Sequence, residues 1–456
     1  MAPLRAQSDA PAGTLALGAA RPRATLAAGD RTALVGTLAL GGLVAAIALV
    51  ALGTAAAPTA LLPTDRTMPH YFPGWLAGPL HAVGLRTSSG VLIAAVVAFC
   101  ACYAVALRCA ARIPDRRLWA AIAAANLAAL LAPPLLSQDV FGYLGFARLA
   151  ALHGLSPYAY TAAAAPHDAI VPLLGWTNVT TPYGPLFTLF TEALVPLGIS
   201  GGLWALKVVA ALTSIATVAV IWRAASRLGH SPRSAAVFYG LNPLVIVFAV
   251  AGAHNETLFG LLLAAGALWL LSGAERRGGA SLAAAAMVKA SAGLALPFAL
   301  LGAQRRGRAL AGAALVLAIA VLAGLLAYGP HLLDAASAWL TQQHQVAGHS
   351  IPSQVSKLLG LGPLAAGVRA AFLGLFAVVL CALLWRTWRG AWWIDCYGYA
   401  TLALLAATAW IFPWYGLWAL LPASLSADRR LRAGALIACA YLVGIKILVS
   451  APLAAS

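Results

Sequence analysis

Charged residues are scarce in this sequence. Asp, Glu, Lys and Arg make up 9% of its 456 residues, whereas soluble proteins average about 25%. Acidic residues number only 12, while hydrophobic residues reach 62%. This composition excludes a water-soluble globular protein. Because apolar segments of membrane-spanning length recur from residue 32 to residue 452, we predict an all-α, polytopic helical membrane protein.

Informative cysteine patterns and the common nucleotide- and metal-binding motifs are also missing. The six cysteines all fall in apolar segments, and none forms a CxxC pair or a Cys/His ligand spacing. This argues against a disulfide framework and against a metal centre. The chain has no Walker A loop, no GxGxxG after a strand, no HExxH and no paired acidic motif. We therefore expect neither a bound metal nor a cofactor.

Basic residues give the chain a formal net charge of +17. They occur in short runs between apolar segments, such as "RIPDRR" and "QRRGR", which is typical of cytoplasmic loops and not of a nucleic-acid surface. We predict a multi-pass inner (plasma) membrane protein with a disordered cytoplasmic tail at residues 1–31. Residues 32–456 would form one membrane domain of about 11–13 helices. Lys207 and Arg369 are among the few cations that this topology leaves away from the cytoplasm.

Two apolar segments do not fit a simple crossing. If residues 185–200 crossed, the following arginine-rich loop would lie outside, so we predict a membrane-dipping helix on the outer face. Residues 281–302 have basic flanks on both sides, which predicts a broken hairpin entering from the cytoplasm, with Lys289 and Ser291 near its tip. A lysine inside a membrane costs about 2.5 to 3.5 kcal/mol, so Lys289 should pair with an anion. No carboxylate is close to it in the sequence.

The stretch "SQDVFGYLGFARL" opens the long outer loop of residues 137–184, our candidate catalytic loop. Asp139, Tyr143 and Phe146 share one face of a helix, which predicts an amphipathic helix at the membrane surface. Asp139 can cap this helix. It can also be a general base on the outer side that takes a proton from a substrate hydroxyl. The two roles are compatible.

Other outer residues are candidates for binding. A tight turn with His254, Asn255 and Glu256 either is solvated, as turns usually are, or recognises substrate hydroxyls. Arg369, inside a span, either snorkels or binds a lipid phosphate. The aromatic cluster "WIFPWYGLWALLP" forms an interfacial belt or stacks on a sugar. The complete set of candidate binding residues is Arg369, Lys289, Lys357, His344, His349, Tyr183, His254, Asn255, Glu256, Trp414 and Tyr415.

The motifs "SQDVFGYL", "PYGPLF", "LNPLV…HNE" and "FPWYGLWALLP", in this order, resemble the glycosyltransferase C superfamily. The likeness covers residues 118–422 and is closest to polyprenol-phosphate-mannose-dependent mannosyltransferases of actinobacterial lipoglycan synthesis, especially the α-1,6-mannosyltransferase family. It implies a bundle of that superfamily's type. It also implies an inverting transfer of a hexose, above all mannose, from a polyprenyl phosphate to a glycan or glycolipid hydroxyl on the extracytoplasmic face. Asp139 matches the family's catalytic acid. The family often has Asp where Glu256 stands.

In this interpretation the donor phosphate lies near Arg369, with Lys289 or Lys357 as secondary candidates, and the sugar faces Asp139. The expected partners are the lipid bilayer, a polyprenyl-phosphate-linked sugar and a glycan or glycolipid acceptor, and not nucleic acid. A lipid-linked sugar flippase or secondary transporter is the alternative, and it predicts repeats and interrupted helices at mid-membrane. A scaffold for another transferase is a third possibility.

Overall fold

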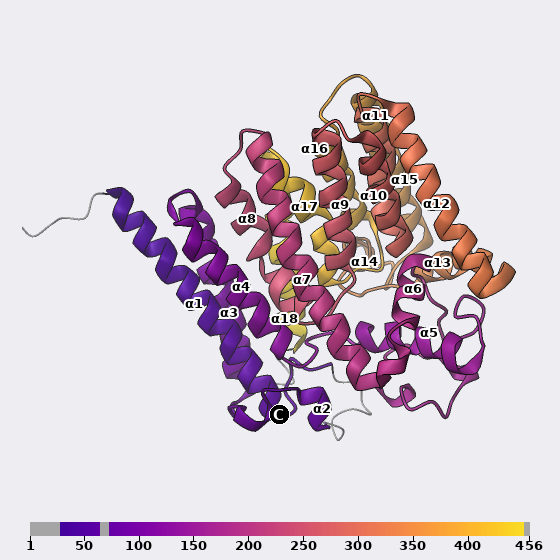
Figure 1. Cartoon of the computed structure of the whole chain (residues 1–456), viewed down its shortest axis with the longest axis horizontal. Helices are drawn as coiled ribbons and strands as arrows, with labels where there is room; N and C mark the ends of the chain where they lie inside the picture. Colours follow the sequence, from indigo (N-terminus) through magenta and orange to yellow (C-terminus); the bar gives the residue numbers. More distant parts are fainter. Residues whose placement is uncertain (1–27, 64–72, 451–456) are drawn as a thin grey trace, which may run out of the picture.

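The computed structural model describes residues 28–63 and 73–450 and shows a bundle of α-helices (Figure 1). Within these ranges the one β pairing is an isolated bridge between Tyr183 and Lys289. The all-α prediction is therefore confirmed. Of the predicted tail at residues 1–31, residues 1–27 lie outside the described residues. Residues 28–31 belong to the first helix, which begins at Ala28.

Helices occupy most of the described chain. The longer ones are α1 (Ala28–Ala56), α3 (Ser89–Cys109), α4 (Asp115–Leu131), α5 (Asp139–His153), α7 (Gly198–Arg227), α9 (Glu256–Leu271), α10 (Glu275–Val288), α12 (Arg306–Tyr328), α15 (Ala366–Trp388), α16 (Trp393–Ala407) and α18 (Arg429–Ser450). The shorter ones are α2 (Gly74–Ala77), α6 (Pro185–Glu192), α8 (Pro232–Gly240), α11 (Ala295–Gly302), α13 (Ala335–His344), α14 (Ile351–Leu358) and α17 (Leu417–Leu425). Several 3-10 turns and one π-helix, η6 (Leu244–Val250), join them.

The number of membrane crossings is the main difference from the sequence prediction. Six helical runs in the described chain are long and apolar enough to span a membrane, or seven if the bent pair of α8 and η6 counts as one span. These runs confirm a multi-pass membrane protein. The predicted spans at residues 118–136, 257–273 and 392–411 form α4, α9 and α16, which have only 17, 16 and 15 residues. In α4 the cause is local, because Pro133 and Pro134 follow the helix and cannot continue it.

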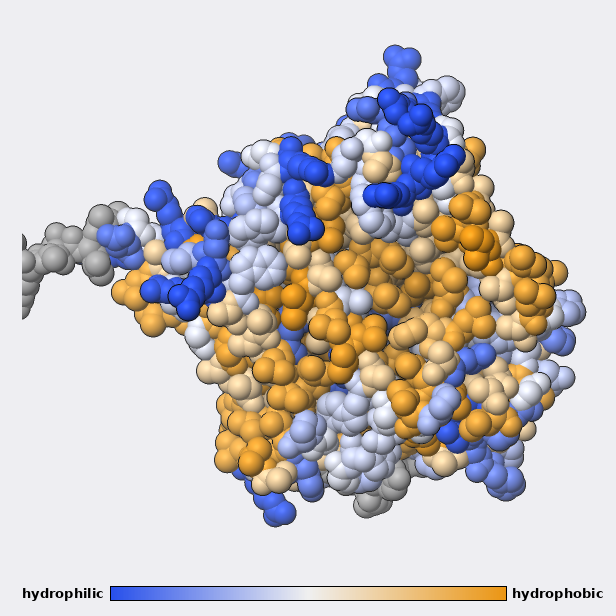
Figure 2. All heavy atoms as spheres, in the orientation of Figure 1, coloured by the Kyte–Doolittle hydropathy of each residue, from blue (hydrophilic) through white to orange (hydrophobic). Residues whose placement is uncertain are grey.

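Arginine side chains gather at one end of the bundle, which we call the basic end. The basic end is the upper edge in Figure 2, which shows hydrophilic clusters there and a broad apolar belt below them. α4, α10, α12 and α18 carry arginines in their first turns, and α7 ends at Arg227. α5 and α6 lie toward the opposite end (Figure 1). With eight residues, about 12 Å, α6 alone is too short to cross a membrane. It continues through a 3-10 turn into α7, and together they form one of the six apolar runs, Pro185–Arg227, so the membrane-dipping position of this segment stays a prediction.

Residues 281–302 form the predicted hairpin. α10 ends at Val288, and the 3-10 turn η7 (Ala290–Leu294) leads the chain into α11, so Lys289 stands at the tip. α12 packs directly against α10 through Gly279 and Gly312. A Cβ atom added at Gly279 would lie 1.9 Å from a main-chain oxygen of α12, and one at Gly312 would lie 1.9 Å from a main-chain oxygen of α10. Small residues therefore set the distance between these two helices.

Substitution of Gly279 by Ala is expected to destabilise the protein by about 1 to 3 kcal/mol, because the added methyl group has no space between the two backbones. Thermal unfolding of the purified protein in detergent measures the effect. Gly374→Ala in α15 is the matched control, since a Cβ there meets open space and Ala is favoured over Gly in a helix. Equal unfolding temperatures for the two variants would show that the helices do not pack this closely.

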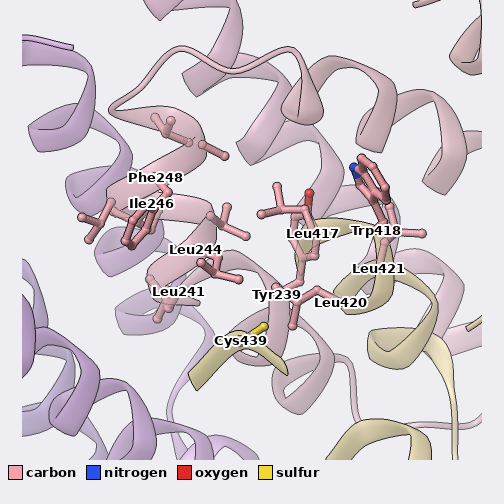
Figure 3. Close-up of a cluster of buried hydrophobic side chains, with 14 of the residues drawn as sticks. Tyr239, Leu241, Leu244, Ile246, Phe248, Leu417, Trp418, Leu420, Leu421 and Cys439 are labelled. Atoms are coloured by element: carbon pink, nitrogen blue, oxygen red, sulfur yellow. The ribbon is translucent and has the colours of Figure 1, made fainter. Parts of the chain in front are cut away.

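The π-helix η6 lies at the centre of the bundle. All seven of its residues are buried, and Figure 3 shows Leu244, Ile246 and Phe248 in one apolar cluster with Leu417 and Leu420 of α17. α17 is also buried along its whole length. This packing fixes the position of the short turn that follows η6, and that turn carries three of the candidate site residues.

Candidate active site

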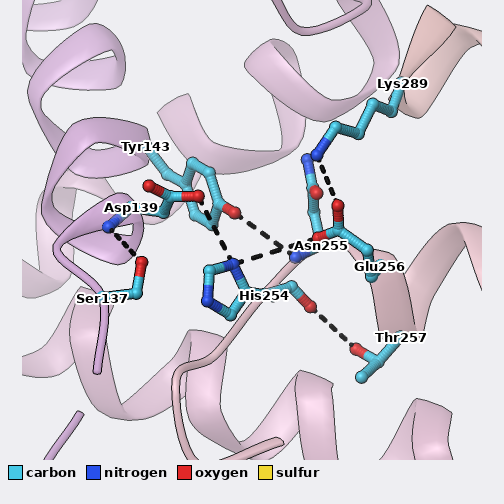
Figure 4. A network of polar contacts seen from close by, with 8 residues as sticks. All are labelled: Ser137, Asp139, Tyr143, His254, Asn255, Glu256, Thr257 and Lys289. Atoms are coloured by element: carbon cyan, nitrogen blue, oxygen red, sulfur yellow. Dashed lines mark hydrogen bonds and ion pairs between the residues drawn. The ribbon is translucent and has the colours of Figure 1, made fainter. Parts of the chain in front are cut away.

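Asp139 is the first residue of α5. Its backbone N–H donates a hydrogen bond to Ser137 Oγ at 3.1 Å, and the N-cap position belongs to Gln138. Capping therefore does not account for the carboxylate. The Asp139 side chain, 17% exposed, points toward His254 instead, with Oδ2 3.4 Å from Nδ1 (Figure 4).

The prediction of an amphipathic helix at the surface is wrong in one respect, because α5 is largely buried. Its buried residues include Phe141 and Leu144, which are not on the face that carries Tyr143. Tyr143 contacts the ring of Tyr183 edge-on, with centroids 5.0 Å apart, and is not an interfacial anchor. The rest of the loop folds over the helix, where Leu174 contacts Gly145. Helical periodicity in the sequence cannot reveal such a cover.

The loop that covers α5 is fastened to it by ion pairs. The Asp168 carboxylate accepts a hydrogen bond from Arg148 Nε at 2.8 Å and lies 2.8 Å from His153 Nε2. Burial alone would raise the pKa of Asp168, but the hydrogen bonds from Arg148 and His153 outweigh it and hold the pKa below its usual value. Arg148 thus anchors the helix within the protein.

The turn formed by His254, Asn255 and Glu256 is buried, so its interpretation as a solvated turn is wrong. All three residues are almost completely inaccessible. Ala253, just before them, has a φ of +55°, a conformation that residues other than glycine seldom adopt. The His254 ring stacks on Trp414 with centroids 3.8 Å apart. Trp414 therefore supports the histidine from behind.

Lys289 finds its anion in Glu256. The Lys289 ammonium and the Glu256 carboxylate form an ion pair, although sequence proximity gave no hint of it. Glu256 is fully buried and the Lys289 side chain is 13% exposed. The ammonium also lies 4.9 Å from the ring centroid of Tyr415 and 5.8 Å from that of Trp418, within the range of cation–π interactions. These contacts offset the cost of placing a lysine here.

Asp139, His254, Glu256 and Lys289 form one polar network, which Figure 4 shows in a single view. Nδ1 of His254 faces both carboxylates, at 3.4 Å from Asp139 and 3.9 Å from Glu256. A proton on Nδ1 can be donated to Asp139 and would hold that carboxylate in place. Across residues 28–63 and 73–450 there is no group of three His, Cys, Asp or Glu side chains placed to hold a metal ion.

A cavity of 150 Å³ opens beside this network. Its polar lining residues are Asp139, Lys289, Ser291, Gln345 and Thr408, and its aromatic walls are Phe146, Trp176, Tyr183, Trp410, Phe412, Tyr415 and Trp418. A concave site with aromatic walls and a few convergent polar groups is typical of small-ligand binding. Of the predicted residues, Asp139, Tyr183, Lys289 and Tyr415 line the cavity. His254, Glu256 and Trp414 do not line the cavity but contact or support the residues that do.

Several lining residues were not predicted as site residues. Trp176 is 44% exposed and contacts Trp410 edge-on, with ring centroids 5.5 Å apart, so it stands where the cavity meets the surface. The Ser291 hydroxyl is buried and has no hydrogen-bond partner among the described residues. Trp176 and Trp410 are far apart in the sequence, and only the folded chain brings their rings into contact.

Four other predicted binding residues belong neither to the cavity lining nor to the polar network beside it: His344, His349, Lys357 and Arg369. Arg369 is partly buried on α15 and donates a hydrogen bond to the main-chain oxygen of His344 at 3.3 Å. Lys357 is exposed and donates to a loop carbonyl at 2.8 Å. Burial is the main reason that the pKa of His349 lies below its usual value, and the charge of Lys446 acts in the same direction. All four residues lie outside the cavity lining.

Comparison with known proteins places most of the chain in two matching regions. Residues 35–305 match the family described as "Alpha-(1->6)-mannopyranosyltransferase, N-terminal domain", and residues 345–449 match "MptB C-terminal domain". The first region contains the whole polar network. The second contains the aromatic cluster of Trp410 to Trp418.

Individual relatives carry the same family name. Alpha-(1->6)-mannopyranosyltransferase A of Mycobacterium tuberculosis is 35% identical over 178 residues, which are 37% of this chain and 33% of that protein. The protein of the same name from Corynebacterium glutamicum is 32% identical over 37% of this chain and 35% of its own length. A "Probable alpha-(1->6)-mannopyranosyltransferase" of Mycolicibacterium smegmatis is 28% identical over 69% of this chain and 66% of its own length. The chain thus aligns with about a third of the length of the first two relatives. No solved structure matches the chain.

Proposed function

Because the chain belongs to the alpha-(1->6)-mannopyranosyltransferase family, we propose that it transfers a mannosyl group from a polyprenyl-phosphate sugar to a hydroxyl of a glycan or glycolipid. The observation that carries this proposal is the cavity, where Asp139, Lys289 and a wall of aromatic rings share one small space. They supply a base for the acceptor, a countercharge for the phosphate and ring faces for the sugar. In our proposal the protein needs no cofactor.

We infer the side of the membrane from the basic end. The positive-inside rule assigns arginine-rich helix ends to the cytoplasm, and α5 lies toward the opposite end of the bundle. The cavity beside Asp139 would then face the extracytoplasmic side of the plasma membrane. A lipid-linked donor can present its sugar on that side, where the acceptor glycan would also lie.

The proposed reaction is a single displacement. The acceptor oxygen forms a bond with C1 of the mannosyl group while the bond between C1 and the phosphate oxygen breaks. Asp139 accepts the proton of the acceptor hydroxyl, and the phosphate leaves with the electron pair of the broken bond. Lys289 stabilises the charge that develops on the phosphate. Attack from the face opposite to the phosphate inverts the configuration at C1.

Lys289 is a better candidate for the phosphate than Arg369. Lys289 lines the same cavity as Asp139 and is held in position by Glu256 and by aromatic rings. Lys357 is exposed, Arg369 is partly buried, and neither lines the cavity, so they can contact a lipid phosphate only away from it. The sequence favoured Arg369 because its position inside a span was unusual, and the pairing of Lys289 with Glu256 was not visible.

Trp176 is expected to bind the acceptor, because it is the exposed ring at the cavity mouth. Trp176→Ala should raise the KM for a mannosyl acceptor about tenfold, in line with about 0.5 to 1.5 kcal/mol for an aromatic contact beyond its buried area. The KM for the donor should stay unchanged. Initial rates at varied acceptor concentration measure this. Trp176→Phe, which keeps an aromatic face, should stay close to wild type. An unaltered acceptor KM in the Ala variant would exclude this role.

The proposed function is tested with purified protein in lipid vesicles that contain polyprenyl-phosphate mannose, together with a mannosyl acceptor. We expect a glycosidic product from this donor and none when a nucleotide-linked mannose replaces it. Movement of the lipid-linked sugar across the vesicle membrane without any glycosidic product would favour a flippase instead. Product from the nucleotide-linked sugar alone would contradict the proposed donor.

A further inference from the structure

Lys207, in the middle of α7, is a completely buried lysine that the proposed mechanism does not use. Its ammonium group donates hydrogen bonds to two main-chain carbonyl oxygens, at 2.8 Å to Ala251 and at 3.1 Å to Ala129. The ion pairs found in the described residues do not include Lys207. A buried charge of this kind is costly unless its surroundings stabilise it.

The two carbonyl groups belong to helix ends. Ala129 lies in the last turn of α4, and Ala251 directly follows η6. The last carbonyl groups of a helix have no partner within the helix and carry partial negative charge. A lysine between two such ends is therefore stabilised by both. It also joins the two helix ends to each other.

The segments that follow these two helix ends lead to Asp139 and His254, which contact each other in the site. The chain after Ala129 runs to Asp139, and the chain after Ala251 runs to His254. The Leu135 N–H donates to the same Ala251 oxygen at 3.3 Å. The Ala251 carbonyl group is thus linked to the other segment both through Lys207 and through Leu135. These links lie a few residues before Asp139 and His254, whose side chains are 3.4 Å apart.

Backbone strain marks the same two segments. Leu136, with φ +62°, and Ala253, with φ +55°, are the residues other than glycine with positive φ in the described chain. Leu136 lies three residues before Asp139, and Ala253 directly before His254. Such conformations persist only where the surrounding structure enforces them. The hydrogen bonds of Lys207 and Leu135 are part of what enforces them.

We infer that Lys207 is a positioning residue that sets the distance between Asp139 and His254. This rests on the proposed function, in which Asp139 is the base. Lys207 never touches the substrate. Without its ammonium group the two helix ends separate, His254 no longer holds the Asp139 carboxylate, and the base loses its orientation.

The test replaces Lys207 by Met, which has a similar length and no charge. Removal of the buried charge offsets part of the cost of leaving the Ala129 carbonyl oxygen without its donor, so stability should change only modestly, whereas kcat should fall about 100-fold, the effect of a misplacement of about 1 Å. The KM for the donor should change little. In an Asp139→Asn background, Lys207→Met should cause no further loss, because Lys207 acts through Asp139. A loss of the same size in both backgrounds would overturn the inference.

A structure of the Lys207→Met variant by cryo-electron microscopy gives a readout that does not depend on activity. We expect Asp139 Oδ2 and His254 Nδ1 to move out of contact, and an unchanged separation would overturn the inference. If the Met variant does not fold, Lys207→Arg replaces it. Arg keeps the charge between the two carbonyl groups, so the site should stay assembled, and a separated site would be the contradicting result. Absence of mannosyl transfer by the wild type would contradict the proposed function and leave this structural comparison intact.

Discussion

Replacement of Asp139 by Asn is expected to lower kcat for mannosyl transfer about 1000-fold. A positioned general base contributes about 10²- to 10⁴-fold, and an amide cannot take the proton of the acceptor hydroxyl. Asn has nearly the same size as Asp and can occupy the same position beside His254, so the fold and the KM for the donor should change little. Initial rates at equal amounts of folded wild-type and variant protein measure the effect.

Asp334→Asn is the matched control for this variant. Asp334 is also an aspartate, but its side chain is exposed, pairs only with His331 among the ion pairs found, and does not line the cavity. This control should retain the wild-type kcat. A well-folded Asp139→Asn variant with wild-type turnover would show that Asp139 is not the base.

Separate replacement of Glu256 by Gln and of Lys289 by Met is expected to destabilise the protein by about 3 to 5 kcal/mol each, because either change leaves one buried charge without its partner. The two changes together should cost much less than their sum, since the double variant contains no unpaired charge. Unfolding in denaturant, followed by the tryptophan fluorescence of the purified protein, measures all four members of this cycle.

The exposed pair of His331 and Asp334 is the reference for this cycle. Exposed ion pairs contribute about 0 to 1 kcal/mol, so Asp334→Asn should leave stability nearly unchanged. If the losses of unfolding free energy in the Glu256 and Lys289 variants were additive, the two residues would not form a buried ion pair. All variants that lose Lys289 should also lose transfer activity, because Lys289 is the proposed partner of the donor phosphate.

The sequence led to the all-α membrane fold, the hairpin with Lys289 at its tip and the choice of Asp139, because each depends on local information. Hydropathy and the positions of arginines predict helices and their sides. A carboxylate in a chain with so few acids stands out by itself. The same scarcity limits the number of partners that a buried lysine can have, so Glu256 was a candidate for Lys289 in principle.

The parts that the sequence did not reveal depend on contacts between distant segments. The pairing of Lys289 with Glu256, the stacking of Trp414 on His254 and the cover over α5 all require the assembled bundle. Without it, Arg369 was the first candidate for the donor phosphate, and the turn at His254 could be either a solvated turn or a recognition site. Lys207 was noticed only as an exception to the topology, because its carbonyl partners have no signature in a sequence.

The most direct test of the proposed mechanism is the configuration of the product. Purified protein in vesicles receives a polyprenyl-phosphate mannose of one defined anomeric configuration and a mannosyl acceptor, and nuclear magnetic resonance determines the new linkage. The single displacement assisted by Asp139 predicts a glycosidic linkage whose anomeric configuration is opposite to that of the donor. A product that retains the donor configuration would contradict the proposed mechanism.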